Sequence, residues 1–332
     1  MVSEIELRRV LKEHQARLLA LPNVIGVGIG RKRVGQQDLD QLSLVVMVEH
    51  KLPLSALSAE SVVPKEIGGV LTDVIEVGKV RSLGGLARQA TEYPDLTLAQ
   101  RRQRWRPASP GVSMGHYQIT AGTFGAVVID QKTKKPLLLS NNHVFANSSG
   151  SGVRQKRASK GDPILQPGAY DGGTKEDAIA KLERFVPLKM LENFQVEVSA
   201  LTETSAANYV DAAVAKPIKT EEITAQIWGI GAPAGIAEAE IGMGVQKSGR
   251  TTGCSRGTVQ LVEMAVQVDY GEGRAATFVG QIGCSAMSQG GDSGSLVLDR
   301  EKRAVGLLFA GSSSITICSP IKLVLEELKV EL

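Results

Sequence analysis

The sequence has little of several features that mark specialised protein classes. Only 3 of its 332 residues are cysteine, too few for the disulfide framework of a small secreted domain. It contains no run of about 18 or more apolar residues, so no membrane-spanning helix is expected. Its 38 lysines and arginines nearly balance 35 aspartates and glutamates, and the net charge of +3 gives no general attraction for nucleic acid or acidic lipid. We therefore expect neither nucleic acid nor a membrane as a partner.

Charge is also informative at two local positions. The segment RRQRWRP at 101–107 places four arginines around Trp105. We interpret it as a solvated linker or a strip that docks a subunit, because no recognised nucleic-acid-binding pattern surrounds it. At the N-terminus, charges interrupt the sequence every few residues and leave no apolar core of signal-peptide length, which predicts a cytoplasmic protein.

Aromatic residues are scarce, at 4%, whereas glycine is frequent, with 36 residues. That balance is typical of a turn-rich β protein. The length predicts about two domains, at ~100–200 residues each.

The pattern of residues 1–82 predicts a small α/β module. Residues 3–20 have the spacing of an amphipathic helix, and Ser3 and Glu6 fit a capping box. Segments typical of strands follow at 24–30, 42–50 and 69–80. The module could oligomerise, recruit substrate or inhibit a cleft; we favour oligomerisation, because its glycine-rich strands could pair with those of a second copy.

The rest of the chain predicts β structure. Residues 83–110 are polar and are interpreted as a linker with one helical stretch near 96–104. From Gly111 onward, short apolar runs alternate with glycine, which predicts β-barrels or a sandwich. The last residues predict a closing helix with Ser319 as its cap and Pro320 at its first position.

The run SQGGDSGSLVLD at 288–299 carries the clearest chemical signal. Glycines on both sides of Ser293 allow a sharp turn that exposes the hydroxyl and directs backbone N–H groups toward one point, as an acyl-transfer oxyanion requires. A serine is a poor nucleophile alone, so a base and an orienting acid are needed elsewhere.

Two further residues fit these roles. Of the four histidines, His143 follows an apolar run that opens into two asparagines, whereas the other three have simpler surface or packing interpretations. Asp211 lies in an apolar segment, where a buried carboxylate needs a hydrogen-bond partner. The competing acid is Asp177, but its charged surroundings allow it to remain solvated, so we prefer Asp211.

With these residues in the order His143, Asp211, Ser293, the chain resembles the chymotrypsin/trypsin family of serine proteases over roughly residues 111–325. The run VQKSGRTTGCSRGTV at 245–259 is similar to a second-barrel strand of bacterial members. With its N-terminal module, the whole chain most resembles an intracellular bacterial group related to plant narrow-leaf proteins.

The resemblance implies a mostly β fold, with a first β-barrel over 111–225, a second over 226–332 and the cleft between them. It implies Ser293 as nucleophile, His143 as general acid/base and Asp211 as the group that orients the histidine. The N–H groups of Gly291 and Ser293 would form the oxyanion hole. Asp292 would be buried beside Lys247 as a structural ion pair.

The resemblance also locates a substrate pocket and one departure from the family. Met287 stands where trypsin-type enzymes carry an acidic residue, which implies cleavage after small or medium apolar residues. Phe309 replaces a serine that hydrogen-bonds the aspartate in relatives. The implied pocket residues are Met287, Ser288, Phe309, Ala310 and Gly311.

We therefore predict a serine endopeptidase that acts on protein or peptide substrates without a cofactor or metal. The alternative is a catalytically weak, protease-like scaffold that binds peptides or partner proteins. Residues 147–207 form a long insertion typical of a lid or subunit contact. Asp162, Asp171 and Asp177 lie in it but lack the spacing of a calcium loop. The three cysteines match no family bridge and are interpreted as buried thiols.

Overall fold

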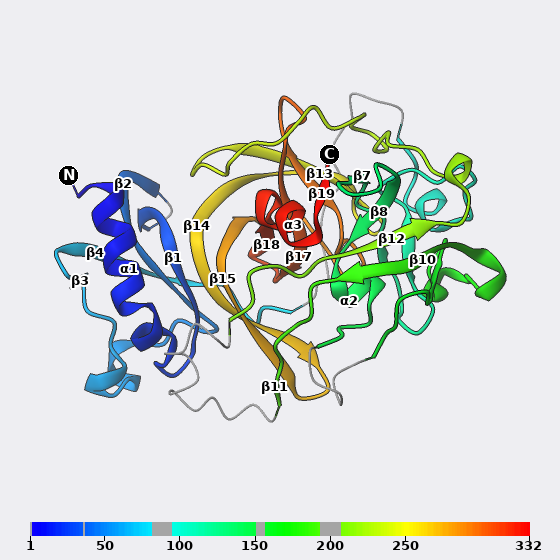
Figure 1. The fold of residues 1–332 in the computed structure, drawn as a ribbon. Coiled ribbons are helices and arrows are strands. Elements are labelled where there is room, and N and C mark those ends of the chain that lie inside the picture. The colour runs from blue at the N-terminus through cyan, green and yellow to red at the C-terminus, as the bar shows by residue number, and fades with distance from the viewer. Residues whose placement is uncertain (1, 36, 82–94, 151–156, 193–206) are drawn as a thin grey trace.

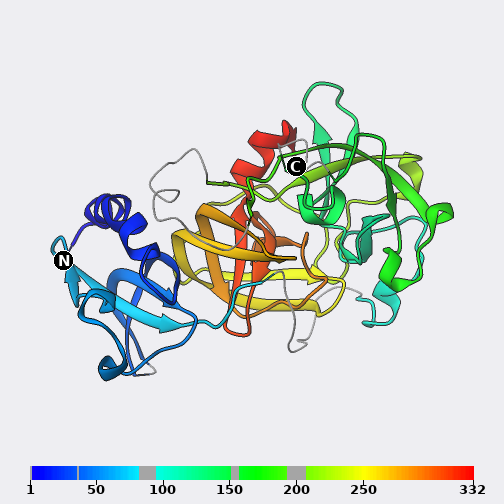
Figure 2. The same cartoon turned by 90° about the horizontal axis from the view of Figure 1, so that it is seen from below.

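The computed structural model describes residues 2–35, 37–81, 95–150, 157–192 and 207–332. Figures 1 and 2 show three parts in a row: the N-terminal module, a central curled sheet, and a second curled sheet at the far side. No helix in the described ranges is both long enough and apolar enough to span a bilayer.

The N-terminal module is one helix packed on a small sheet. Helix α1 (Glu4–Leu19) begins as predicted, with the Ser3 hydroxyl accepting a hydrogen bond from the Glu6 N–H. Its buried face packs against the sheet through Leu7, Val10, Leu11 and Leu18. The strands are β1 (Val24–Val34), β2 (Gln37–Val48), β3 (Glu66–Ile67) and β4 (Val70–Glu76). β2 pairs antiparallel with β1 and parallel with β4.

An eight-stranded antiparallel sheet forms the first barrel-like part, in the order β19-β7-β8-β12-β10-β9-β5-β6. Its strands are β5 (Ser113–His116), β6 (Gly122–Thr123), β7 (Ala126–Asp130), β8 (Pro136–Ser140), β9 (Pro163–Leu165), β10 (Ala178–Phe185), β12 (Ala213–Pro217) and β19 (Val330–Glu331). The short helix α2 (Asn142–Phe145) follows β8 directly.

The second part is a closed set of six strands, because β15-β18-β17-β16-β13-β14 is completed by pairing of β14 with β15. Its strands are β13 (Gly244–Gly249), β14 (Gly253–Gly271), β15 (Arg274–Ser285), β16 (Leu296–Asp299), β17 (Ala304–Gly311) and β18 (Ile315–Pro320), with β11 (Leu191–Glu192) at the edge of β15. The predicted fold class, a mostly β chymotrypsin-like double barrel with an N-terminal α/β domain and a closing helix, is confirmed.

The N-terminal module is joined to the second barrel by strand pairing. β1 pairs antiparallel with β14, so the strands of the module extend the second sheet to eleven strands. The close approach explains two glycines in β1: a Cβ on Gly26 would lie 3.0 Å from the Ala265 carbonyl oxygen, and one on Gly30 would lie 2.9 Å from that of Gln260. Both edges of β1 are thus occupied within the chain.

The C-terminal helix α3 (Ile321–Leu328) joins the two barrels. Its apolar face lies in one core cluster with residues of both sheets, among them Val128 of β7 and Leu307 of β17. Figure 1 shows it between the two sheets. The helix starts one residue later than predicted, with Pro320 as its cap. The Ser319 hydroxyl instead donates to the Gln281 side chain at 3.0 Å.

The arginine-rich strip at 101–107 docks within the same chain. Its helical part is limited to a 3-10 turn at Gln100–Arg102. The side chain of Arg101 is fully buried and donates to the Gly111 carbonyl and the Ser248 hydroxyl, each at 2.8 Å. Since Ser248 belongs to β13, this contact fastens the strip to the second barrel. Arg101 is therefore not solvated, whereas Arg104 of the same strip is 57% exposed.

Candidate active site

Ser293 lies in the loop between β15 and β16, where the backbone turns as the glycine pattern predicts. Gly291 and Gly294 have φ values of +93° and +94°, which L side chains rarely adopt. A Cβ on Gly294 would lie 2.1 Å from the Ser140 Oγ, so the loop also packs too closely for a larger residue. Ser293 itself is 4% exposed.

His143 and Asp211 are in direct contact. His143 lies in α2, and its Nδ1 is 2.7 Å from the Asp211 Oδ2. The backbone N–H of His143 also donates to the Asp211 Oδ1, at 3.2 Å. The carboxylate is fully buried, as the sequence argument for Asp211 required, and the imidazole is 13% exposed. The other carboxylate considered, Asp177, binds Arg104 at 3.1 Å and lies apart from this pair.

Tyr270, near the end of β14, is a residue that the sequence analysis missed. Its hydroxyl donates to the Asp211 Oδ2 at 2.6 Å. Burial first, and then the negative charge of Asp211, raise the pKa of Tyr270 well above its ordinary value, so the hydroxyl remains a donor at neutral pH. Phe309 offers the aspartate no hydroxyl, and Tyr270 supplies the bond from a different strand.

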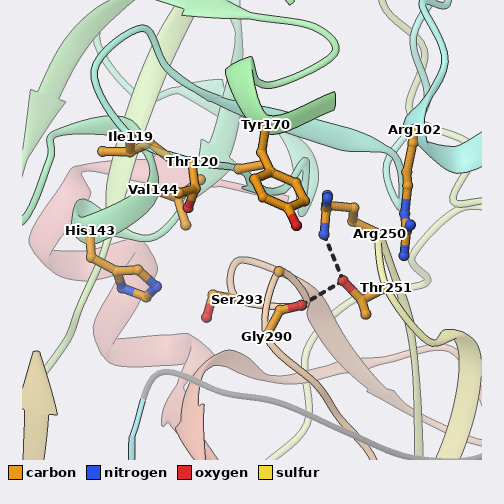
Figure 3. Close-up of a pocket in the computed structure, with 12 residues that line it drawn as sticks. Arg102, Ile119, Thr120, His143, Val144, Tyr170, Arg250, Thr251, Gly290 and Ser293 are labelled. Carbon is orange, nitrogen blue, oxygen red and sulfur yellow. Dashed lines mark hydrogen bonds between the residues drawn. The ribbon is translucent and has the colours of Figure 1, made fainter. Parts of the chain in front are cut away.

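His143 and Ser293 line the same cavity, of about 480 Å³. Figure 3 shows the imidazole and the serine on one side of it, with Arg102 and Arg250 toward the other end. Within the described part of the chain, the Ser293 Oγ makes its hydrogen bond to the Phe309 carbonyl, at 3.4 Å, rather than to His143. The serine and histidine therefore face a common space without being bonded to each other.

The Ser293 loop also presents backbone donors. The N–H groups of Asp292, Gly294 and Ser295 donate to carbonyls of the protein. The N–H groups of Gly291 and Ser293 have no acceptor among the described residues. These are the two groups that the sequence resemblance assigns to an oxyanion hole.

Asp292 and Lys247 form an ion pair at 3.1 Å, with both side chains fully buried. Burial raises the pKa of Asp292, but the charge of Lys247 and several hydrogen bonds outweigh burial and leave that pKa lowered. Burial lowers the pKa of Lys247, and the charge of Asp292 opposes it. The Asp292 carboxylate accepts from the Thr251 N–H at 2.8 Å and from the Gln289 N–H at 2.8 Å, so the ion pair organises the whole serine loop.

A second ion pair supports the loop from the cavity side. Arg250 binds Asp171 through two bonds of 2.6 Å, and both side chains are nearly buried. Arg250 also donates to the Thr251 hydroxyl, which in turn donates to the Gly290 carbonyl at 2.6 Å. Asp171 belongs to the long insertion, so residues far apart in sequence jointly hold the glycines that precede Ser293.

The residues predicted to form the substrate pocket do not line this cavity. The side chain of Phe309 is fully buried against Phe278, with ring centroids 4.6 Å apart. Met287 is 3% exposed, and the Ser288 hydroxyl bonds the Thr316 hydroxyl at 2.7 Å. Ala310 is buried as well, and the Gly311 backbone is paired with Arg81. Strand pairing by Arg81 covers this edge, which accounts for the closed surroundings.

The remaining candidate groups each have a separate partner. His116 is fully buried, and its Nε2 is 3.1 Å from the Asp162 Oδ2. Burial lowers its pKa. No group of metal-binding side chains occurs among the described residues. The interpretation of Cys254, Cys284 and Cys318 as buried thiols is confirmed.

Comparison with known proteins finds similar proteins only among solved structures. No family model matches the chain, and no curated protein does. Protease A of Thermobifida fusca is 19% identical, with a TM-score of 0.45 over 68% of this chain and 98% of its own. A Nocardiopsis protease is 18% identical, with a TM-score of 0.45 over 68% and 99%. A glutamic-acid-specific serine protease is also 18% identical, with a TM-score of 0.46 over 68% and 100%.

Proposed function

We propose that the protein is a serine endopeptidase whose nucleophile is Ser293. The observation that carries the proposal is the contact of His143 with a fully buried Asp211, on the same cavity as Ser293. A fully buried carboxylate, a histidine bonded to it through Nδ1 and a serine across the cavity are the components of acyl transfer by a serine hydrolase.

The reaction would begin with rotation of the Ser293 hydroxyl from the Phe309 carbonyl toward His143. Apo structures commonly show such catalytic bonds loose or unmade. The His143 Nε2 then takes the hydroxyl proton as Ser293 Oγ attacks the peptide carbonyl carbon. Because Nδ1–H donates to Asp211, the free nitrogen is the one that faces the cavity, and the carboxylate stabilises the imidazolium that forms.

The negative charge that develops on the carbonyl oxygen would be stabilised by the N–H groups of Gly291 and Ser293, for which the described part of the chain offers no other acceptor. The imidazolium then protonates the leaving amine, which departs and leaves an acyl-enzyme on Ser293. A water molecule, deprotonated by His143, hydrolyses this ester and restores the free serine. No metal or cofactor takes part in this sequence.

The substrate preference and cellular setting are part of the same proposal. We propose cleavage after small or medium apolar residues, because Met287 stands where an acidic selector occurs in trypsin-type enzymes. We also propose a cytoplasmic enzyme of the intracellular bacterial type that resembles plant narrow-leaf proteins, supported by three free cysteines. Assembly into a homo-oligomer through the N-terminal module stays a prediction.

One observation favours a second candidate, a protease-like scaffold that binds peptides without turnover. The Ser293 hydroxyl is bonded to a backbone carbonyl and not to His143. Labelling with a fluorophosphonate probe separates the two candidates. The protease requires covalent labelling of the wild-type protein at Ser293 and its loss in Ser293→Ala and His143→Ala. A folded wild-type protein that resists the probe would instead support the scaffold.

A further inference from the structure

Beside Ser293, strand β17 has an edge that β16 leaves unpaired. β16 pairs with it as far as Leu307, and two backbone bonds extend this contact to Leu308. Beyond that point the chain of β16 has turned away into the Ser293 loop, and the Phe309 carbonyl accepts from the Ser293 hydroxyl. The edge of Phe309–Gly311 is therefore free of β16 and leads directly to the nucleophile.

A segment of the same chain occupies this edge. The Arg81 N–H donates to the Gly311 carbonyl and the Gly311 N–H donates to the Arg81 carbonyl, each at 2.9 Å, in an antiparallel bridge. The Ser312 hydroxyl donates to the Val77 carbonyl. This segment, Val77–Arg81, is thus bound by main-chain hydrogen bonds, which is how an extended peptide adds to a sheet edge.

The side chains of the segment Val77–Arg81 also pack against the second barrel. Val77 and Val80 are 2% and 3% exposed, and both belong to the core cluster that contains Phe309 and Ala310. Arg81 also contacts the tip of β14 through a bridge to Asp269. In Figure 2 the chain leaves β4 and runs toward the strands of the second sheet.

The direction of the segment is that of a substrate. Because the pairing is antiparallel, the direction from Val77 to Arg81 is the direction from Gly311 toward Phe309 on β17, and so toward Ser293. A peptide bound this way would place the residues that precede its scissile bond along β17. A peptide with about three residues before that bond would reach Gly311 and meet Val77–Arg81 there.

We propose that Val77–Arg81 is a built-in competitor of peptide substrates, so that the protease is autoinhibited until this segment leaves the edge of β17. The inference rests on the proposed peptidase function and assigns its regulation to the N-terminal module. The segment starts one residue after β4, and the sheet of β4 is continuous with β14, so its local concentration at the edge is high. A substrate binds only in proportion to the fraction of molecules with a free edge.

The first test compares Arg81→Pro with Arg81→Ala. Proline removes the N–H that bonds Gly311, whereas alanine keeps it and loses an exposed side chain whose 3.9 Å contact with Asp269 contributes little at the surface. We expect Arg81→Pro to lower the KM for a peptide amide with three residues before the scissile bond by about threefold to tenfold, with kcat unchanged. Arg81→Ala should match the wild type. An unchanged KM in a folded Arg81→Pro protein would overturn the proposal.

A single-residue ester provides an internal control, because its acyl part does not reach Gly311. Both variants should hydrolyse it as the wild type does. A gain on this ester equal to that on the peptide would mean that the substitution altered Ser293 and its neighbours, which contradicts competition at Gly311.

The second test needs no variant. A tripeptidyl boronic acid that forms an adduct with Ser293 would take the edge of β17 and displace the segment. Hydrogen exchange at the Arg81 amide should then become faster, because that N–H loses the Gly311 carbonyl. If the boronic acid binds and this exchange is unchanged, autoinhibition is wrong while the peptidase stands. If neither the boronic acid nor a fluorophosphonate reacts with Ser293, the proposed function itself fails.

Discussion

The hydroxyl of Tyr270 is the most informative single group to remove. It donates to the Asp211 Oδ2 at 2.6 Å, on the same oxygen that contacts His143. Tyr270→Phe keeps the ring, which packs edge-on to His143 with centroids 5.9 Å apart, and deletes only the donor. The substitution therefore isolates one hydrogen bond to a buried carboxylate.

The size of the effect follows from the charge on Asp211. A hydrogen bond to a charged group contributes about 1.5–3 kcal/mol, and about 1.4 kcal/mol corresponds to tenfold in rate. If the bond serves to hold Asp211 for His143, Tyr270→Phe should lower kcat by about tenfold to a hundredfold. KM should stay within about twofold, because Tyr270 is not among the residues that line the cavity.

The assay is steady-state hydrolysis of a peptide amide, with chemical unfolding of each variant measured in parallel. Tyr209→Phe is the matched control, since Tyr209 is 46% exposed and its hydroxyl makes no hydrogen bond within the described residues. A folded Tyr270→Phe protein with kcat within twofold of the wild type would refute a positioning role. A rise in KM with kcat unchanged would likewise show that Tyr270 acts on binding rather than through Asp211.

Two further predictions concern the loop that carries Ser293. Lys247→Met should destabilise the protein by about 3–5 kcal/mol in urea unfolding and abolish peptide hydrolysis, because it leaves the fully buried Asp292 without its cation; full activity in this variant would exclude the ion pair as the support of the loop. Asp171→Asn should lower kcat by about tenfold and destabilise the protein by about 1.5–3 kcal/mol, because the nearly buried Arg250 loses the charged partner that fixes it against the loop; Glu176→Gln, on the neighbouring exposed turn Lys175–Asp177, should leave kcat and stability unchanged.

Much of the candidate site could be predicted from the sequence, because the signals for these residues lie in their immediate neighbours along the chain. Ser293 lies between glycines whose positive φ values the turn requires, so the tetrapeptide itself encodes the loop. Asp211 could be predicted because a carboxylate in an apolar run needs a partner, and the structure gives it three donors, two from His143 and one from Tyr270. In both cases the prediction followed from what a single residue requires of its surroundings.

Tyr270 could not be predicted in the same way. It lies near the end of a 19-residue strand, where a tyrosine is an ordinary residue. Its role depends on where that end comes to lie in the folded barrel, which no local pattern encodes. The one available hint came from the resemblance to serine proteases, which implies a serine at the position of Phe309, since a buried carboxylate that lacks one donor needs another.

The pairing of β1 with β14 was also beyond the sequence analysis, although a signal was present. Glycines at 26, 28 and 30 lie on one face of a strand, and that spacing indicates a close neighbour. It does not identify the neighbour or the register, because strand pairing between distant segments depends on the whole fold. The same limit concealed the contact of Arg81 with Gly311.

These long-range contacts converge on β14. One part of this strand pairs with β13, which carries Lys247, and the next part, Leu261–Val266, pairs with β1 of the N-terminal module. Its tip then contacts Arg81 through Asp269 and supports Asp211 through the adjacent Tyr270. Asp269, which contacts the segment Val77–Arg81, and Tyr270, which donates to Asp211, are therefore neighbours on one strand. Removing the whole module would take away Val45 and Met47, which share a core cluster with Met264 and Val266 of β14. Regulation by this module therefore has to move the segment Val77–Arg81 while β1 stays paired with β14.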